Sequence, residues 1–458
     1  MDPRTSRRRR SRASADAVTG DVSSLLLPNT VVGGPASPRC MVGGRGALLW
    51  DGSGRQYIDA TAGLGQCAVG YGHPQLVQAA ALQMQRLASF PMFAGSVSEP
   101  AVSLADRLRA IAPTGLSKTF YTSGGSEGVE TALKFARIAH FSTGASERTL
   151  ILTRKGAYHG TTAGALAVTD IDAFHLGLRG SRQQSVPLSL PHARPLGPDA
   201  TDMLIDELER TIAAIGGERI AAFIGEPVLG VSGMIPAPPG YWPRLQQVLK
   251  RHRILLIADE VATGYGRTGD WFACPQQGIE PDIMVTAKAL TSGYVPMGAV
   301  LFSDAVIDML HGTRLPHGFT FGGHAAAAAV ALANLDVIEQ EHLTDRAAKL
   351  GTHLLRQLEP LEELPWVEEV RGTGLMLAVE LTPHAAAAAR DLPARAAASG
   401  VLLRNSPHNI CLTPPLVITD AQAQHTIDVI TAEVRALGRA RSPRAVTERE
   451  GGSVRRPG

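Results

Sequence analysis

The sequence predicts an α/β protein whose main sheet is mostly parallel and covered by helices on both faces. Between about residues 90 and 325, short runs of continuously apolar residues alternate with helical patterns. Strands buried on both faces have this continuous apolar pattern, and helices are the usual connections between parallel strands. The runs that show the pattern are 149–152, 221–224, 254–258, 283–285 and 298–302.

Length and composition divide the chain further. A chain of 458 residues exceeds the size at which one hydrophobic core stops growing, so we expect at least two domains. Residues 42–58 are predicted to form a hairpin, and residues 325–341 a long helix. The predicted units are a disordered basic tail (1–22), an N-terminal segment that joins the smaller domain (23–89), a large domain (90–325), the C-terminal part of the smaller domain (326–437) and a second disordered tail (438–458).

Charge and cysteine content argue against several classes of function. The net charge is +2, of which the first twelve residues contribute +5 through six arginines and Asp2, so the remainder carries −3. A body without excess positive charge argues against a nucleic-acid partner. No run of 18 apolar residues exists and no apolar signal segment follows the arginines, so we expect neither a membrane span nor secretion. Four widely spaced cysteines argue against disulfides or a zinc site and fit a cytoplasmic location.

The pentapeptide GGSEG at 124–128 admits two interpretations. It matches the G-x-S-x-G pattern of a hydrolase, in which Ser126 would be the nucleophile. It is also a glycine-rich loop between a strand-like segment (119–122) and a helical pattern (129–136), which is how many proteins hold a phosphate. The local sequence fits both interpretations, and the residues at the other strand ends distinguish between them.

A lysine and an aspartate each end a strand of buried type. Lys288 lies just beyond the apolar run 283–285, at the end of a buried-strand pattern, where burial lowers the pKa of an amine and makes it a candidate for Schiff-base chemistry. The alternative is a lysine whose long stem reaches the surface. Asp259 and Glu260 follow five apolar residues, and their side chains point to opposite faces, so only one faces a given ligand. A buried carboxylate needs a cationic partner such as a protonated pyridine nitrogen, with metal ligation or helix capping as alternatives.

Two further strand ends add an aromatic ring and a second acid. Tyr158 and His159 follow the strand at 149–152, and Glu226 follows the strand at 221–224. Ligands of open α/β sheets bind beyond the carboxyl ends of the strands, where an aromatic ring can stack on a planar ligand. His159 suggests acid–base chemistry, although a single loop histidine is more often structural. Together the phosphate loop, the aromatic ring, the acid and the buried lysine describe a site for pyridoxal 5′-phosphate.

At this point the sequence resembles the class III (omega) aminotransferases, a branch of the fold-type I pyridoxal-phosphate enzymes. The resemblance covers roughly 43–431 and is closest to the amine or omega-amino acid–pyruvate branch. It implies a large domain with a mostly parallel seven-stranded sheet and a smaller α+β domain formed by the N- and C-terminal segments. The stretches that carry it are LLIADEVATGYGRTGDWFA (255–273), GIEPDIMVTAKALTSGYVPMGAV (278–300) and HGFTFGGHAAAAAVALANLDVIE (317–339).

The resemblance implies a role for each matching residue around the cofactor ring. Lys288 would form the Schiff base and then carry the proton during catalysis, and Asp259 would pair with the pyridinium nitrogen. Tyr158 would stack on one face of the ring and Val261 would pack on the other, with Glu226 near the ring hydroxyl. His159 belongs to the same predicted cofactor-binding set.

The resemblance also implies phosphate and substrate contacts. Gly125 and Ser126 would bind the phosphate of their own subunit, and Thr320 would reach the phosphate of the neighbouring subunit in a homodimer. Arg404 would grip the carboxylate of the keto acid. Gly65 stands where many amine–pyruvate members have a pocket tryptophan, which implies a larger or differently shaped pocket, and Phe93 is a pocket wall by position alone.

We therefore predict an aminotransferase that moves an amino group from an amine or omega-amino acid to a keto acid, most simply pyruvate, by a ping-pong mechanism. An aminomutase, decarboxylase or racemase on the same fold uses the same lysine and aspartate and is the first alternative. A serine hydrolase needs an oxyanion loop of HGGG type, which is absent before Ser126. A binding or scaffold protein would have no need of an intact Lys288, Asp259 and Thr320.

Overall fold

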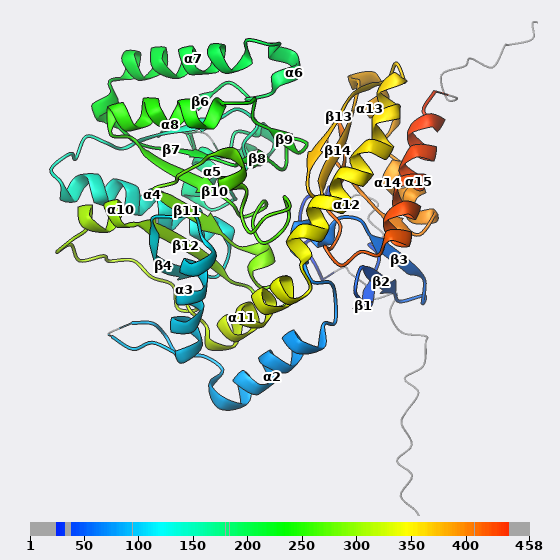
Figure 1. The fold of residues 1–458 in the computed structure, drawn as a ribbon, viewed down its shortest axis with the longest axis horizontal. Coiled ribbons are helices and arrows are strands. Elements are labelled where there is room, and N and C mark those ends of the chain that lie inside the picture. The colour runs from blue at the N-terminus through cyan, green and yellow to red at the C-terminus, as the bar shows by residue number, and fades with distance from the viewer. Residues whose placement is uncertain are drawn as a thin grey trace, which may run out of the picture.

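The computed structural model describes residues 24–32, 38–93, 95–178, 180–182, 184–406 and 408–438. They form a large unit around one central sheet and a smaller unit with two sheets of its own (Figure 1). The two predicted tails, 1–22 and the residues after Gly438, lie outside the described residues. Among the described helices, none has the length and apolar character needed to cross a bilayer.

The central sheet has seven strands, and the predicted mostly parallel α/β fold is confirmed. Four of its six strand pairings are parallel, and β12 is antiparallel to both of its neighbours, β4 and β11. The pairings of β10 with β7 and β11, and of β5 with β6 and β7, are parallel. In spatial order the strands are β4 (Leu116–Thr122), β12 (Gly298–Ser303), β11 (Ile283–Thr286), β10 (Leu255–Asp259), β7 (Ile220–Gly225), β5 (Leu150–Arg154) and β6 (Ser185–Leu188).

Both faces of this sheet are buried, which is why its strands have continuous apolar sequences. Along β10, Ile257 packs into a core with helix α4, whereas its neighbours Leu256 and Ala258 pack into the core on the other face. Helices α7 and α8 cover that second face (Figure 1). The helices of the large unit are α3 (Glu99–Ile111), α4 (Gly125–Ser142), α5 (Ala163–Val168), α6 (Ala193–Leu196), α7 (Ala200–Ile215), α8 (Tyr241–His252), α9 (Ala273–Gln277) and α10 (Asp304–Met309).

The smaller unit is built from both ends of the chain, as predicted. The parallel pairing of β3 with β15 joins the N-terminal hairpin to the C-terminal segment. One sheet has the order β1 (Met41–Arg45), β2 (Leu48–Asp51), β3 (Gln56–Asp59) and β15 (Val401–Leu402). The other has the order β13 (Val367–Thr373), β14 (Met376–Leu381), β17 (Asn409–Leu412) and β16 (Arg404–Asn405). The helices of this unit are α12 (Leu343–Leu358), α13 (Pro383–Ala388), α14 (Leu392–Ala398) and α15 (Asp420–Ala436).

The long helix predicted at 325–341 is α11 (Ala325–Gln340), and it packs against α2 (Pro74–Leu87) and α3. Figure 1 shows α11 and α2 side by side below the central sheet. The domain boundaries predicted at 89/90 and 325/326 stay predictions. The helix before the first boundary packs on the helix after the second, so the two segments support each other.

Candidate active site

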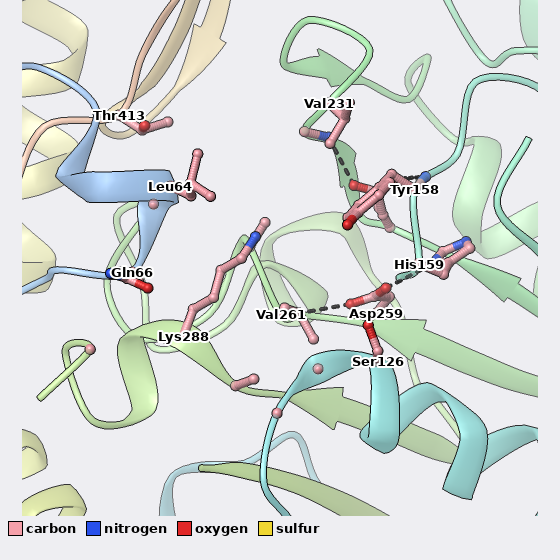
Figure 2. Close-up of a pocket in the computed structure, with 18 of the residues that line it drawn as sticks. Leu64, Gln66, Ser126, Tyr158, His159, Val231, Asp259, Val261, Lys288 and Thr413 are labelled. Carbon is pink, nitrogen blue, oxygen red and sulfur yellow. Dashed lines mark hydrogen bonds and ion pairs between the residues drawn. The ribbon is translucent and has the colours of Figure 1, made fainter. Parts of the chain in front are cut away.

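A cavity of about 360 Å³ lies where the carboxyl ends of the parallel strands face the smaller unit. Figure 2 shows Tyr158, Asp259 and Ser126 on one side and Leu64, Gln66 and Thr413 on the other, with Lys288 extending between them. Among the predicted site residues, the cavity is lined by Gly65, Gly125, Ser126, Tyr158, His159, Glu226, Asp259, Val261, Lys288 and Arg404. The structure thus brings together all of the predicted residues except Phe93 and Thr320.

Lys288 enters the cavity from a short 3-10 turn, Lys288–Leu290, that follows β11. Its backbone has φ of +44°, a left-handed conformation that residues with a Cβ rarely adopt. Surrounding protein lowers the pKa of the Lys288 amine by desolvation, against opposing effects of Asp259 and Glu226. The amine therefore carries less positive charge near neutral pH than a surface lysine does, which favours its use as a nucleophile.

Asp259 is the last residue of β10 and is held from two sides. Its Oδ1 accepts a hydrogen bond from the Val261 backbone N–H at 3.0 Å, and its Oδ2 lies 2.7 Å from Nδ1 of the buried His159. The next carboxylate, Glu260, faces away from the cavity and accepts hydrogen bonds from the Cys274 backbone N–H at 2.6 Å and the Thr263 hydroxyl. Of the two acids, Asp259 lines the cavity and Glu260 does not, in agreement with strand alternation.

Glu226 closes the same edge of the sheet at the end of β7. Its Oε1 accepts a hydrogen bond from the Tyr158 backbone N–H at 3.1 Å, and its Oε2 accepts one from the Gly230 N–H at 2.9 Å. Burial raises the pKa of Glu226, and His159 opposes that shift. The Tyr158 ring packs on Phe174 with ring centroids 5.1 Å apart, which limits how the ring can turn.

The start of α4 offers an anion site. The first backbone N–H groups of a helix have no acceptor within the helix, and here the first intrahelical bond runs from Gly128 N–H to Gly124 O at 3.0 Å. A Cβ placed on Gly124 would meet no atom within 4 Å, so there is room beside the loop. Ser126 Oγ accepts from the Thr161 N–H at 3.2 Å, and among the described residues no histidine or carboxylate hydrogen-bonds to it. This setting suits a phosphate ligand better than a nucleophile.

The opposite wall of the cavity includes residues that sequence reasoning missed. Leu64 and Gln66 come from a turn that Asp59 organises, because its carboxylate accepts hydrogen bonds from the Thr61 and Gly63 N–H groups at 2.9 and 2.8 Å. Gly65 in this turn has φ of +76°, which favours glycine. The smaller unit adds Arg404, Thr413 and Met376 to the lining. No periodicity in the sequence places these segments opposite the strand ends.

A missed arginine lies just behind the strand-edge wall. Arg154, the last residue of β5, is fully buried and donates through Nη2 to the backbone O of Glu226. Its guanidinium carbon lies 4.9 Å from the centroid of the Trp242 ring. A charged residue inside a strand pattern was the only signal for it in the sequence.

Phe93 and Thr320 lie outside this cavity in the single chain. Phe93 is 51% exposed and lines a second cavity, of about 680 Å³, together with Phe319 and Gly318. Thr320 is exposed in the turn before α11. Their predicted roles stay predictions.

An amine, a buried carboxylate, a helix start and an aromatic ring around one cavity are what a pyridoxal-phosphate site needs. A family model described as aminotransferase class-III matches residues 32–434. The chain belongs to the class III aminotransferases. It is 34% identical to the putrescine–pyruvate aminotransferase of Pseudomonas aeruginosa, over 85% of this chain and 89% of that protein.

Solved structures of omega-transaminases agree with this assignment. A thermostable (S)-enantioselective omega-transaminase from Thermomicrobium roseum superposes with a TM-score of 0.84 at 41% identity, covering 87% of this chain and 93% of that one. The omega transaminase from Pseudomonas jessenii in complex with PMP superposes with a TM-score of 0.88 at 32% identity, covering 92% and 98%.

The residues of this aminotransferase fit the cofactor of its family, pyridoxal 5′-phosphate. Asp259 is a buried acid with an anchored orientation, as a protonated ring nitrogen requires. The start of α4 provides N–H donors beside open space, as a phosphate requires. Lys288 places an amine of lowered pKa in the same cavity.

Proposed function

We propose that this enzyme moves an amino group from an amine or omega-amino acid donor to a keto acid, with pyruvate as acceptor, in two ping-pong half-reactions. The observation that carries the proposal is the placement of Lys288 and Asp259 on one side of a cavity and Arg404 on its lining. One relative is named for putrescine and pyruvate, which supports both an amine donor and this acceptor. An aminomutase, decarboxylase or racemase on this fold remains the alternative reaction.

The protein's part of the chemistry is to hold the cofactor and to move one proton. When bound, pyridoxal phosphate acts as an electron sink for the substrate carbon next to nitrogen. Lys288 Nζ would link to the cofactor and, once the substrate amine has replaced it there, would be free to carry a proton to and from that carbon. Asp259, oriented by His159 and the Val261 N–H, would hold the ring nitrogen protonated.

Other lining residues would position the cofactor. The N–H groups of Gly125 and Ser126 would bind its phosphate at the start of α4, where the helix dipole favours a negative charge. Tyr158 would stack on one face of the ring and Val261 would pack on the other. Glu226 would lie near the ring hydroxyl, held in place by the Tyr158 and Gly230 N–H groups.

Arg404 would select the acceptor. Its planar guanidinium can form two parallel hydrogen bonds with a carboxylate, which suits the carboxylate of a keto acid. It reaches the cavity from β16 in the smaller unit. Because the donor and acceptor use the same cavity in turn, the apolar residues Leu64, Val231 and Met376 would pack on the substituent of an amine donor.

The quaternary arrangement that we propose is a homodimer in which Thr320 reaches the phosphate of the neighbouring subunit. Thr320 is exposed and lies away from its own cavity, and the adjacent Phe321 is 63% exposed. In the same assembly, Phe93 would form part of the wall of the substrate pocket. We also propose a cytoplasmic location, which agrees with four free cysteines, all within the described residues.

The absorbance spectrum of the purified enzyme tests the first half-reaction. A panel of amines is added without any keto acid, and the visible band of the bound cofactor is followed. We expect a donor to bleach the band and pyruvate to restore it. The Lys288→Ala variant is the control: it should remain folded and dimeric but show neither change. A wild-type band that no amine alters would contradict the proposal.

A further inference from the structure

A partly buried polar cluster joins the smaller unit to one edge of the cavity. His192, Glu369 and Glu380 bring their ligand atoms within 4.8 Å of one another, a grouping that in other settings holds a metal ion. Here Arg371 already lies among them. Its Nη1 donates to Glu369 Oε2 at 2.6 Å and also to Glu380. The guanidinium supplies the positive charge of the cluster, and Arg371 also makes hydrogen bonds outside it.

Arg371 and its neighbour Asn409 in the smaller unit both reach the backbone of the large unit. Arg371 Nε donates to the backbone O of Gly233 at 2.8 Å, and Arg371 Nη2 donates to Asn409 Oδ1 at 2.6 Å. Asn409 Nδ2 in turn donates to the Ser232 backbone O at 3.4 Å. Arg371 and Asn409 are 5% and 6% exposed. Two buried side chains, from β13 and β17, therefore hold the same turn in the large unit.

The turn they hold is part of the cavity wall. It connects β8 (Val228–Leu229) to β9 (Ile235–Pro236), and Val231 and Met234 from it line the cavity. At its other end it is tied to the cofactor side, because the Gly230 N–H donates to Glu226 Oε2. The turn thus lies between the proposed cofactor site and the smaller unit.

Its backbone needs outside support. Met234 has φ of +57° and Gly233 has φ of +113°, both in the left-handed range. Such a conformation persists in a residue with a Cβ only where neighbouring contacts impose it. A Cβ on Gly233 would lie 2.5 Å from the Asn409 side chain, so the contact is also close. Without Arg371 and Asn409, we expect the turn to relax and Met234 to move.

We propose that Arg371 and Asn409 are positioning residues for substrate choice: they hold the turn 230–234 so that Val231 and Met234 form the wall on which the larger substituent of the amine packs. This inference rests on the proposed function, because it assumes that an amine occupies this cavity. Neither residue lines the cavity, so neither takes part in the chemistry itself. The prediction is therefore a change in KM that depends on substrate size.

The test compares two amines in the holoenzyme, with pyruvate as acceptor. Asn409→Ala is measured with 1-phenylethylamine, which is bulky, and with isopropylamine, which is small. We expect KM for 1-phenylethylamine to rise about 10-fold, since loss of the contact made by a single methylene group in an apolar pocket costs about 10-fold or more. KM for isopropylamine and kcat for both amines should change by less than about threefold, because the strand-edge groups are untouched.

Two further variants keep the test decisive. Arg371→Lys retains a cation in the cluster but loses the forked donation, so it should shift KM in the same direction. Arg395→Met is the matched control, because Arg395 forms a 2.6 Å ion pair with Glu433 within the smaller unit and has no place in the cavity lining. If Asn409→Ala does not fold, the same comparison of KM for the two amines is made with Arg371→Lys.

The outcomes separate the two proposals. Equal changes in KM for both amines, or the same size-dependent change in Arg395→Met, would overturn the role of Arg371 and Asn409 while leaving the proposed function intact. If the unaltered enzyme shows no change in cofactor absorbance with either amine, the proposed function fails and this inference fails with it.

Discussion

The two walls of the active-site cavity are built in different ways. The strand-edge wall places Asp259 and Glu226 at the ends of buried strands, and each carboxylate is held by two hydrogen bonds. The opposite wall combines Leu64, Met376 and Arg404 from segments far apart in the chain. Figure 2 shows Lys288 extending into the space between the two walls.

The difference separates chemistry from substrate choice. Groups at strand ends are fixed by a sheet that is buried on both faces, so they suit steps common to every substrate. Residues on the opposite wall depend on how the smaller unit packs. A change on the strand-edge wall should therefore reduce turnover of all substrates, whereas a change on the opposite wall should alter which substrates bind.

The largest expected effect is that of Asp259→Asn on the strand-edge wall. The amide keeps the shape of the side chain but cannot stabilise a protonated ring nitrogen. We expect kcat to fall about 100-fold or more with every donor, as for other losses of electrostatic stabilisation in an active site. Steady-state kinetics with two unrelated amines measures it.

The neighbouring acid is the matched control for that variant. Glu260 is equally buried but faces away, with its pKa raised by burial and its oxygens bound to Cys274 and Thr263. Glu260→Gln should change kcat far less than Asp259→Asn does. Similar losses in both variants would mean that Asp259 acts through folding and not through the cofactor.

A smaller and more selective effect is expected for Arg404→Ala on the opposite wall. Loss of a bidentate carboxylate contact should raise KM for pyruvate about 10-fold to 100-fold, equivalent to about 1.4 kcal/mol per factor of ten. Half-reaction rates with amines that lack a carboxylate should change little. Stopped-flow measurement of the two half-reactions separates these effects, and equal loss in both would refute the role of Arg404.

The smallest effect concerns pH. Desolvation lowers the pKa of Lys288, so its amine becomes neutral below the ordinary lysine value of about 10.4. Cofactor uptake by the stripped enzyme, from which the cofactor has been removed, needs the neutral amine of Lys288. Its rate should therefore rise with pH and level off below about 10.4. In the window between the two pKa values the unfolded chain binds more protons than the folded one, so stability of the stripped enzyme should also rise with pH.

Cofactor uptake can be followed by absorbance, and Lys288→Ala provides the baseline for binding without the amine. A rate that keeps climbing up to the ordinary lysine pKa would show that burial does not lower the pKa of Lys288. Such a result would leave the cofactor assignment intact, but it would remove the argument that the site activates this lysine.

Much of the strand-edge wall could be predicted because it depends on local sequence. The apolar runs that end at Asp259, Lys288 and Glu226 predict buried parallel strands, and such strands deliver their ends to one edge. The second carboxylate, Glu260, was correctly placed on the other face by strand alternation alone. The partner of Asp259 could not be predicted, because His159 lies 100 residues away and only the crossover brings it to 2.7 Å.

The sequence by itself determined the fold class, the family and the residues at the strand ends, since residue type and spacing along buried strands carry that information. The family resemblance implied Arg404 and Gly65 in the substrate pocket, but only the tertiary structure decided how the opposite wall is assembled and which other residues it contains. Leu64, Met376 and Arg404 become neighbours through the pairing of β3 with β15 and the packing of the smaller unit. The hold of Arg371 and Asn409 on Gly233 likewise joins segments with no local relation. Such contacts depend on side-chain packing across units, which no periodicity in one segment encodes.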